Sequence, residues 1–295
     1  MNDRPRPLLA ASALALAGCF WGTGFLFGKI AFREMTVPEN VAFRFVAGTA
    51  ALSPILFSRW KAWRLRDLAM LFLAALLGVP IQFLIQFRGL ELTTVSHASL
   101  IVGVLPVLLA LSSALFLGER LRPLEWAVLL LSAIGAVFIA LSTKRSIGGP
   151  QPGLRGDMLV LISLFAAVAM ILCSKRLVER YDPLRVTAAI ISIGTILLLI
   201  WVEVTQPLRF NFSTKTWMAV LAQGLLATAG AYLLWNWGLA RVPASRASVF
   251  LNLEPVVGAI LGVAVLHERL GIMALFGGAL IVGAAVYFST RPQHT

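Results

Sequence analysis

The sequence contains few charged residues for its length. Its 295 residues include 25 Lys or Arg and 13 Asp or Glu, whereas about a quarter of the residues in a soluble domain are charged. A soluble protein of this size needs a polar surface, and so few charges cannot cover one. The composition excludes ordinary soluble enzymes, disordered proteins and secreted disulfide scaffolds, and it predicts a surface that faces lipid.

Cysteine and histidine are also scarce. The two cysteines, Cys19 and Cys173, lie inside apolar runs and form no disulfide framework. The three histidines (His97, His267 and His294) lack the spacing of metal ligands, and the sequence has no phosphate-binding or dinucleotide-binding glycine pattern. We therefore predict that the protein is not an enzyme and that it holds no metal and no cofactor.

The net charge of +12 does not by itself indicate a nucleic-acid partner. The basic residues lie in short clusters between long apolar runs, which is typical of the flanks of membrane spans. The partners that we expect are the lipid bilayer and a small-molecule substrate, with no nucleic acid and no obligatory protein partner.

Apolar residues make up 59% of the chain, in runs of about 20 residues, the length at which a helix crosses a bilayer. Because lipid offers the backbone no hydrogen-bond partner, these runs must be helices. We predict an all-α membrane protein with ten transmembrane helices. Polar residues interrupt the second span (Arg44) and the third (Gln82, Gln86 and Arg88). The ten spans cover about residues 8–30, 39–57, 67–88, 97–117, 123–142, 156–177, 184–204, 216–238, 245–265 and 271–289.

The basic residues also predict the orientation. With the N-terminus in the cytoplasm, 15 of the 25 basic residues lie on the inside, including the two densest short clusters, which follow the second and sixth spans. We therefore expect both termini in the cytoplasm. Lys29 and Lys175, near the ends of the first and sixth spans, are expected to extend to the membrane surface. Alternatively, they attract carboxylates toward a cavity.

The chain resembles itself. The segment from Gly89, GLELTTVSHAS, recurs from Gly238 as GLARVPASRAS, and the same offset of 149 aligns the later segments LGERL and LHERL. The earlier spans align at an offset of 146. We predict two repeats, residues 1–147 and 148–295, within one integral membrane domain. Since each repeat has five spans, an odd number, the second must enter the membrane in the opposite sense. Inverted repeats of this kind underlie alternating access.

The ten spans, the five-plus-five repeat, residues 20–24 (FWGTG) and the paired ERL segments resemble the EamA branch of the drug/metabolite transporter superfamily. The resemblance covers nearly the whole chain. It implies a transporter of a bacterial inner membrane, with a central cavity between the two repeats. Within this family the chain resembles amino-acid exporters of the YddG type, and this narrower resemblance implies aromatic and neutral amino acids as substrates.

Two proline-containing segments are candidate linings of the cavity. Pro106 and Pro255 are repeat mates, and each leaves a backbone carbonyl without its helical donor. Such carbonyls persist in a membrane where protein or a hydrated cavity satisfies them. Ser99 and its mate Ser248 precede the prolines, and Ser248 shares a helical face with Asn252. We interpret the polar residues as substrate-binding and the prolines as helix kinks; the alternative is two kinks packed against neighbouring helices.

Two other spans also carry a polar face. Gln82 and Gln86 are four residues apart in the third span, and Tyr232, Trp235 and Asn236 share a face of the eighth. Amides, hydroxyls and aromatic rings together can bind the ammonium, the carboxylate and the side chain of an amino acid. We interpret both faces as substrate-binding; the alternative is hydrogen bonding between helices without a ligand.

Trp21 lies in the middle of the first span, too deep for the aromatic belt at a membrane interface. We interpret it as a wall of the substrate cavity, with core packing as the alternative. The glycines around it form two GxxxG pairs, which allow another backbone to approach closely. These pairs are Gly18 with Gly22 and Gly24 with Gly28.

Glu254 is the only acidic residue near the middle of a span. An ionisable residue at this depth is a candidate for substrate binding or ion coupling. However, helical spacing places it on the same face as Gly258 and Gly262, and its repeat mate is Leu105. Both a coupling or binding role and a structural role, in which Glu254 bonds a neighbouring helix, therefore remain open.

These observations predict a secondary transporter that exports small amphipathic metabolites by alternating access through a central cavity. Aromatic and neutral amino acids are the substrates that we expect. The alternatives are a carrier or exchanger of other metabolites, such as nucleobases, sugars or drugs, and a channel.

Overall fold

The computed structural model describes residues 7–56, 62–92, 101–142, 154–266 and 271–290, and these form helices and connecting turns with no β-strand. The helices of the first half are α1 (Pro7–Ala31), α2 (Val37–Leu56), α3 (Leu65–Leu76), the π-helical η1 (Leu77–Ile81), α4 (Gln82–Glu91), α6 (Leu105–Leu117) and α7 (Pro123–Ser142). Those of the second half are α8 (Leu154–Val178), α9 (Pro183–Thr205), α10 (Thr214–Ala222), the π-helical η2 (Gln223–Gly230), α11 (Ala231–Leu239), α12 (Ala244–Ala247), the 3-10 helix η3 (Ser248–Asn252), α13 (Leu253–Leu266) and α14 (Ile272–Thr290).

Six helical segments of the described chain are long and apolar enough to cross a membrane. They are Leu8–Gly28, Leu65–Gly89, Leu154–Val178, Pro183–Thr205, Thr214–Leu239 and Ile272–Thr290. The segments Leu105–Leu117 and Pro123–Ile139 are apolar but shorter. The prediction of an all-helical fold is therefore confirmed for the described residues, whereas the number of ten spans stays a prediction.

The third and eighth predicted spans are not the uniform helices that the sequence suggests. Each contains a π-helical segment, and residues 77–81 and 223–230 overlap when the repeats are aligned at the offset of 149. In η1 the cause is visible, because Pro80 has no N–H for a regular helical hydrogen bond. π-Helical turns are rare and concentrate at functional sites. No proline explains η2.

The two repeat-related prolines lie at helix starts rather than within continuous helices. Pro106 occupies the first turn of α6, where a missing N–H costs nothing. Pro255 lies in the first turn of α13, directly after the 3-10 helix η3. The chain from Ala244 to Leu266 is thus divided into three helical segments by a change of helix type before the proline.

A hydrogen bond joins two positions that the sequence repeat makes equivalent. Thr49 on α2 and Thr195 on α9 are 146 residues apart, and their hydroxyl oxygens lie 2.8 Å from each other. A residue that contacts its own mate marks a two-fold relation between the two helices.

Close contacts around this point occur in matching pairs. A Cβ atom added at Gly48 would lie 2.7 Å from Thr228 Cγ2, and one added at Gly194 would collide with the side chain of Val79. Gly194 is the mate of Gly48 at the offset of 146, and Val79 is the mate of Thr228 at 149. The same relation holds for the contacts of Gly89 with Val160 and of Gly238 with Leu14.

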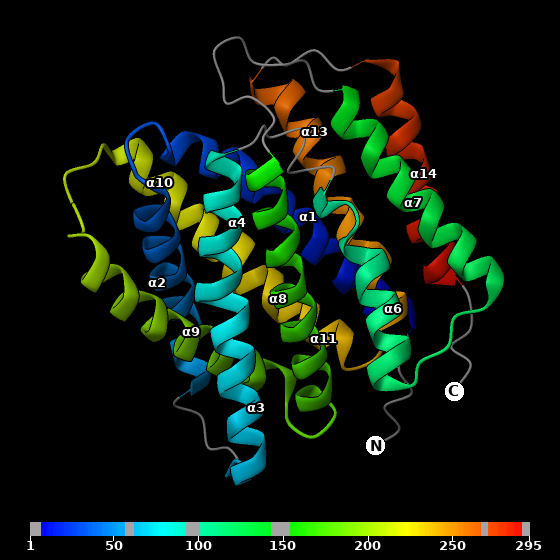
Figure 1. The fold of residues 1–295 in the computed structure, drawn as a ribbon, viewed down its shortest axis with the longest axis horizontal. Coiled ribbons are helices and arrows are strands. Elements are labelled where there is room, and N and C mark those ends of the chain that lie inside the picture. The colour runs from blue at the N-terminus through cyan, green and yellow to red at the C-terminus, as the bar shows by residue number, and fades with distance from the viewer. Residues whose placement is uncertain (1–6, 57–61, 93–100, 143–153, 267–270, 291–295) are drawn as a thin grey trace.

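Equivalent helices of the two halves run in opposite directions (Figure 1). In this view α3 continues upward into α4, whereas α10 continues downward into α11. The neighbouring helices α7 and α14 are likewise antiparallel, and Gly135 packs directly against Gly277 between them. The hydrophobic core runs through the bundle and includes Leu14, Phe45, Leu164, Leu198 and Trp235.

Candidate substrate site

Three aromatic residues that the sequence singles out meet inside the bundle. Trp21 on α1 makes an edge-to-face contact with Tyr232 on α11, with ring centroids 5.5 Å apart. Trp21 also lies 5.3 Å from the ring of Trp235, one turn further along α11. Tyr232 and Trp235 are buried, Trp21 is half-buried, and the indole N–H of Trp235 has no hydrogen-bond partner among the described residues. The three rings therefore form an aromatic surface in which the Trp235 N–H is available to donate to a ligand.

The glycines around Trp21 account for the close packing of α1. A Cβ atom at Gly22 would lie 2.7 Å from the carbonyl oxygen of Glu254, so this side of α1 rests on α13. A Cβ atom at Gly24 would lie 3.2 Å from Ala227 Cβ, so the next face rests on η2. The two GxxxG pairs thus allow close approach, as predicted, but to two different neighbours.

Arg44 on α2 is a charged residue of this interior, and we predicted no role for it from the sequence. Its side chain is 5% exposed. Its Nε–H donates to Thr228 Oγ1 (2.8 Å) and one Nη donates to the carbonyl oxygen of Ala227 (3.4 Å), both on η2. The guanidinium also lies over the rings of Phe83 (4.8 Å) and Phe45 (5.2 Å). The signal was available, because a charge inside a span is by default a candidate functional residue.

Arg44, Tyr232 and Glu254 form an electrostatic group. Arg44 interacts electrostatically with both Tyr232 and Glu254, and Tyr232 also interacts with Glu254. No ion pair of 4.0 Å or less joins Arg44 to Glu254. The two opposite charges therefore interact without forming an ion pair. We refer to Trp21, Arg44, Tyr232, Trp235 and Glu254 as the central group.

Three of the predicted binding residues form hydrogen bonds within the protein. The amide of Asn236 donates to Thr187 Oγ1 (2.8 Å), and that of Asn252 donates to Ser132 Oγ (2.9 Å). The hydroxyl of Ser248 donates to the carbonyl oxygen of Ser245 (2.7 Å). These contacts match the alternative of bonding without a ligand. Ser99, the predicted binding residue that is the repeat mate of Ser248, lies outside the described residues.

Gln82 and Gln86 lie at the start of α4, directly after η1, and both are half-buried. The side-chain oxygen of Gln82 is buried and accepts no hydrogen bond from the described residues. Because a buried polar atom without a partner is costly, this oxygen is a candidate acceptor for a ligand.

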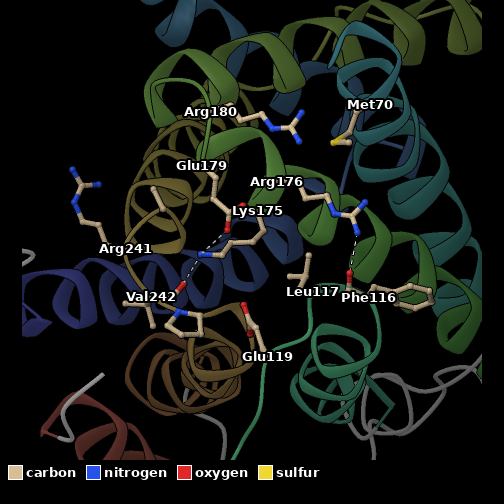
Figure 2. Close-up of a pocket in the computed structure, with 12 residues that line it drawn as sticks. Met70, Phe116, Leu117, Glu119, Lys175, Arg176, Glu179, Arg180, Arg241 and Val242 are labelled. Atoms are coloured by element: carbon tan, nitrogen blue, oxygen red, sulfur yellow. Dashed lines mark hydrogen bonds and ion pairs between the residues drawn. The ribbon is translucent and has the colours of Figure 1, made fainter. Parts of the chain in front are cut away.

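A hollow of about 590 Å³ opens at one end of the bundle, where α6, α8 and the α11–α12 connection meet (Figure 2). Four of the six charged residues in its lining are basic. We expected Lys175 to extend to the membrane surface, and this is wrong: its Nζ is directed inward and donates to the carbonyl oxygens of Leu239 (2.9 Å) and Val242 (3.1 Å). It therefore caps the last turn of α11, where a positive charge is favoured. The charged lining residues are Glu119, Lys175, Arg176, Glu179, Arg180 and Arg241.

Glu119, from the LGERL segment, connects the two halves at this hollow. Its carboxylate accepts the backbone N–H groups of Ala244 (2.9 Å) and Ser245 (2.8 Å), in the first turn of α12. These donors have no partner inside their own helix, so the carboxylate satisfies both of them.

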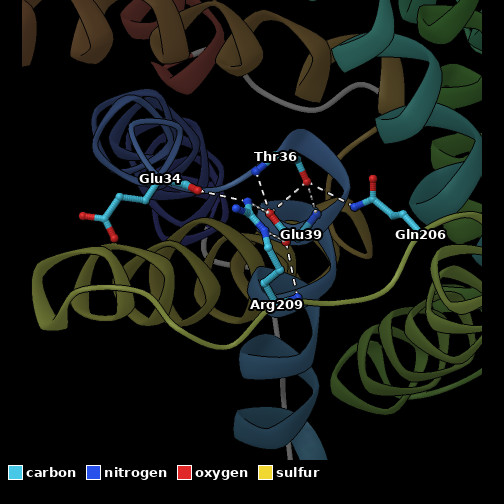
Figure 3. Close-up of polar contacts among 5 residues, drawn as sticks. All are labelled: Glu34, Thr36, Glu39, Gln206 and Arg209. Carbon is cyan, nitrogen blue, oxygen red and sulfur yellow. Dashed lines mark hydrogen bonds and ion pairs between the residues drawn. The ribbon is translucent and has the colours of Figure 1, made fainter.

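The opposite end of the bundle is held by an ion-pair network (Figure 3). Arg209 binds the buried carboxylate of Glu39 through two bonds of 2.7 Å, and the hydroxyl of Thr36 donates to the same carboxylate at 2.9 Å. The hydrogen bonds that Arg209 donates to Glu39 raise the pKa of Arg209 above its ordinary value. A second hollow, of about 1060 Å³ and mainly apolar, lies beside this network between α4 and α9. Neither hollow is lined by the central group.

The sequence profile of the EamA-like transporter family matches residues 8–141 and again residues 154–290. The chain belongs to this family. It is therefore a membrane transporter of the drug/metabolite type and not an enzyme, as the sequence predicted. The two matches cover both halves of this EamA-like transporter.

Known relatives are similar over most of their length. An uncharacterized transporter of Archaeoglobus fulgidus is 31% identical across the full length of both chains. A probable terminal-alkyne amino-acid exporter of Streptantibioticus cattleyicolor is 28% identical over 77% of this chain and 75% of its own. A solved crystal structure with 22% identity matches 95% of this chain and 96% of its own with a TM-score of 0.78, which shows a shared fold.

Proposed function

We propose that this EamA-like transporter is a secondary carrier that exports small amphipathic metabolites, in particular aromatic and neutral amino acids, by alternating access. The observation that carries the proposal is the central group: three aromatic rings are in contact inside an apolar bundle, and the buried Arg44 interacts electrostatically with one of them, Tyr232, and with Glu254. Charged residues are costly at this depth and mark substrate or ion pathways in membrane proteins. The aromatic rings suit the side chain of the substrate, and the polar groups suit its charged ends.

We further propose ten transmembrane helices, arranged as two inverted five-helix repeats over residues 1–147 and 148–295. Matching contacts at the offsets 146 and 149, and the opposite directions of equivalent helices, support this arrangement. Contacts that occur in both halves survive when the halves exchange conformations. We assign the crossing of α2 and α9 at Thr49 and Thr195 as the fixed point of this exchange.

The location that we propose is a bacterial inner membrane, with both termini in the cytoplasm. The distribution of basic residues supports this orientation. The hollow lined by Lys175, Arg176 and Arg180 then faces the cytoplasm, where its positive charge attracts substrates that carry a carboxylate.

The predicted residues receive different roles. We propose that Trp21, Tyr232 and Trp235 bind the apolar part of the substrate and that the side-chain oxygen of Gln82, with Gln86 beside it, accepts from a polar part. Ser99, Ser248, Asn236 and Asn252 are secondary candidates. Glu254 belongs to the substrate site or to ion coupling.

Counterflow in proteoliposomes tests the proposed function. A carrier accelerates the uptake of labelled phenylalanine, tryptophan, leucine or alanine when the vesicles are preloaded with the same unlabelled amino acid. A channel shows uptake without acceleration. The absence of flux for every amino acid would contradict the substrate class, and the same assay with nucleobases, sugars and amphipathic drugs then tests the alternative substrates.

A further inference from the structure

Arg44 carries more hydrogen-bond donors than the described residues accept. A guanidinium has five N–H donors, and Thr228 and Ala227 accept two of them. The aromatic rings of Phe83 and Phe45 compensate part of its charge but accept no conventional hydrogen bond. An arginine that is 5% exposed thus keeps donors that suit a carboxylate, which guanidinium binds through two parallel bonds.

The opposite charge lies close by but does not neutralise Arg44 by contact. Glu254 interacts electrostatically with Arg44, yet the two are not within the 4.0 Å of an ion pair. The carbonyl oxygen of Glu254 lies against Gly22, next to Trp21, so this residue borders the aromatic surface. Tyr232 interacts with both charges and contacts Trp21. Arg44 on α2 and the backbone of Glu254 on α13 therefore approach the same aromatic residues from two different helices.

We infer that Arg44 and Glu254 form a zwitterion site, in which Arg44 binds the carboxylate of an α-amino acid and Glu254 binds its ammonium. The side chain of the amino acid then lies against Trp21 and Tyr232. This inference rests on the proposed carrier function, because it names the chemical class of substrate that the central group selects.

The electrostatics explain why both ends of the substrate are required. A zwitterion leaves the net charge of the site unchanged and pairs each buried charge with an opposite one. A ligand that lacks one end leaves Arg44 or Glu254 unpaired in the bilayer interior. We therefore expect analogues without the carboxylate or without the ammonium to bind roughly 10- to 100-fold more weakly than the amino acid.

Competition with such analogues tests the inference. Purified protein in proteoliposomes is assayed for counterflow of labelled phenylalanine, or of whichever aromatic or aliphatic amino acid it transports. The competitors are the unlabelled amino acid, its amide (no carboxylate) and its N-acetyl derivative (no ammonium). The wild type should be inhibited by the amino acid and at least about tenfold more weakly by either analogue. Equal inhibition by all three would overturn the zwitterion site.

Two variants assign the two ends. Arg44→Gln should weaken the inhibition by the unlabelled amino acid and bring it closer to the inhibition by the amide. Glu254→Gln should bring the inhibition by the amino acid closer to the inhibition by the N-acetyl derivative. Arg66→Gln makes the same change at an exposed position of α3. It should leave unchanged both ratios of inhibition, that of the amino acid to the amide and that of the amino acid to the N-acetyl derivative. A purely structural role would lower flux with unchanged ratios, and that result would overturn the assignment. If Glu254→Gln instead abolishes a dependence on the pH gradient and leaves the ratios unchanged, the glutamate couples protons and its assignment to the ammonium is wrong.

Binding separates the failure of this inference from the failure of the carrier function. Titration of the detergent-solubilised protein with the same ligands, followed by tryptophan fluorescence, reports binding without transport. Selective binding of the amino acid without counterflow would support the zwitterion site and contradict the carrier. Binding of none of the amino acids would overturn the zwitterion site.

Discussion

The contacts between the two halves of the chain are of two kinds. Around the crossing of α2 and α9 each contact occurs twice, once in each half. Gly48 packs against Thr228, and the equivalent residue Gly194 packs against Val79, which is equivalent to Thr228. Around Arg44 they occur once, because the position equivalent to Arg44 is Ile190, which is buried in the apolar core. The duplicated contacts build the scaffold, and we propose that the residues of the unduplicated ones bind the substrate.

This difference has a mechanical consequence. If the two halves exchange conformations, a contact with a counterpart in the other half exists before and after the exchange. A contact without a counterpart in the other half differs between the state before the exchange and the state after it. The central group belongs to the second kind, since the mate of Trp21 is Ala167 and the mate of Tyr232 is Phe83.

The largest expected effect is on the unduplicated side. Arg44→Gln should reduce counterflow by at least tenfold while the protein remains folded, because the variant loses the guanidinium but keeps a polar side chain beside Thr228. Arg44→Lys keeps the charge without the two-pronged donor geometry and should be intermediate. Counterflow and size-exclusion profiles of both variants are the measurements, and full activity of Arg44→Gln would contradict the distinction.

On the duplicated side, Gly48→Leu and Gly194→Leu should destabilise the protein by similar amounts. Each introduces a side chain where even a Cβ atom has no room, and overpacking of this kind costs about 1–3 kcal/mol. The control is Gly278→Leu, because no atom lies within 4 Å of a Cβ added there. Thermal unfolding in detergent measures all three. A large loss in only one of the two variants would contradict their equivalence.

An effect of comparable size is expected at the two ends of the bundle. Asp67 is buried and accepts hydrogen bonds from Arg180 (2.8 Å) and Tyr181 (2.7 Å), whereas Glu39 at the other end is bound by Arg209. Asp67→Asn and Glu39→Gln should each lower the free energy of unfolding by roughly 1.5–3 kcal/mol, the value of a hydrogen bond to a charged group. Melting temperatures of the two variants test this expectation. Unchanged melting temperatures would show that neither network stabilises its end of the bundle.

The smallest effect concerns pH. Two hydrogen bonds from Ser213, from its N–H (2.8 Å) and its hydroxyl (2.7 Å), lower the pKa of Glu34 in the α1–α2 turn. A lowered pKa in the folded state stabilises the protein above the unfolded pKa, and this contribution disappears as the pH falls through the folded value. Glu34→Gln should therefore lower the melting temperature slightly at pH 7 and less at pH 4. An equal difference at both pH values would contradict this account.

Much of the scaffold could be predicted from the sequence, because its causes are local or periodic. Apolar runs of fixed length require helices. The repeat offsets identify Gly48 and Gly194 as equivalent before any contact is known, and the GxxxG pairs identify the faces of α1 that other helices approach. Trp21, Tyr232 and Trp235 were predicted from their depth and helical spacing, and they lie together.

The rest depends on partners that lie far away in the chain. Periodicity places Asn252 on a polar face but does not reveal that Ser132, 120 residues earlier, lies opposite. Arg209, which binds Glu39, lies 170 residues later in the sequence, and Thr228, which binds Arg44, lies 184 residues later. The π-helical segment η2 has no proline or other local mark. Such features arise only when the helices have assembled.

The central claim is that the duplicated crossing of α2 and α9 stays fixed while the unduplicated interior changes. A cross-link between positions 49 and 195 tests it most directly, because the two hydroxyl oxygens lie only 2.8 Å apart and cysteines so close together can form a disulfide. The measurement is counterflow by Thr49→Cys/Thr195→Cys, in a protein with Cys19 and Cys173 replaced by serine, before and after oxidation. The account predicts that the oxidised protein transports at the rate of the reduced one. Loss of transport on oxidation, with recovery on reduction, would show that α2 and α9 must separate and would contradict it.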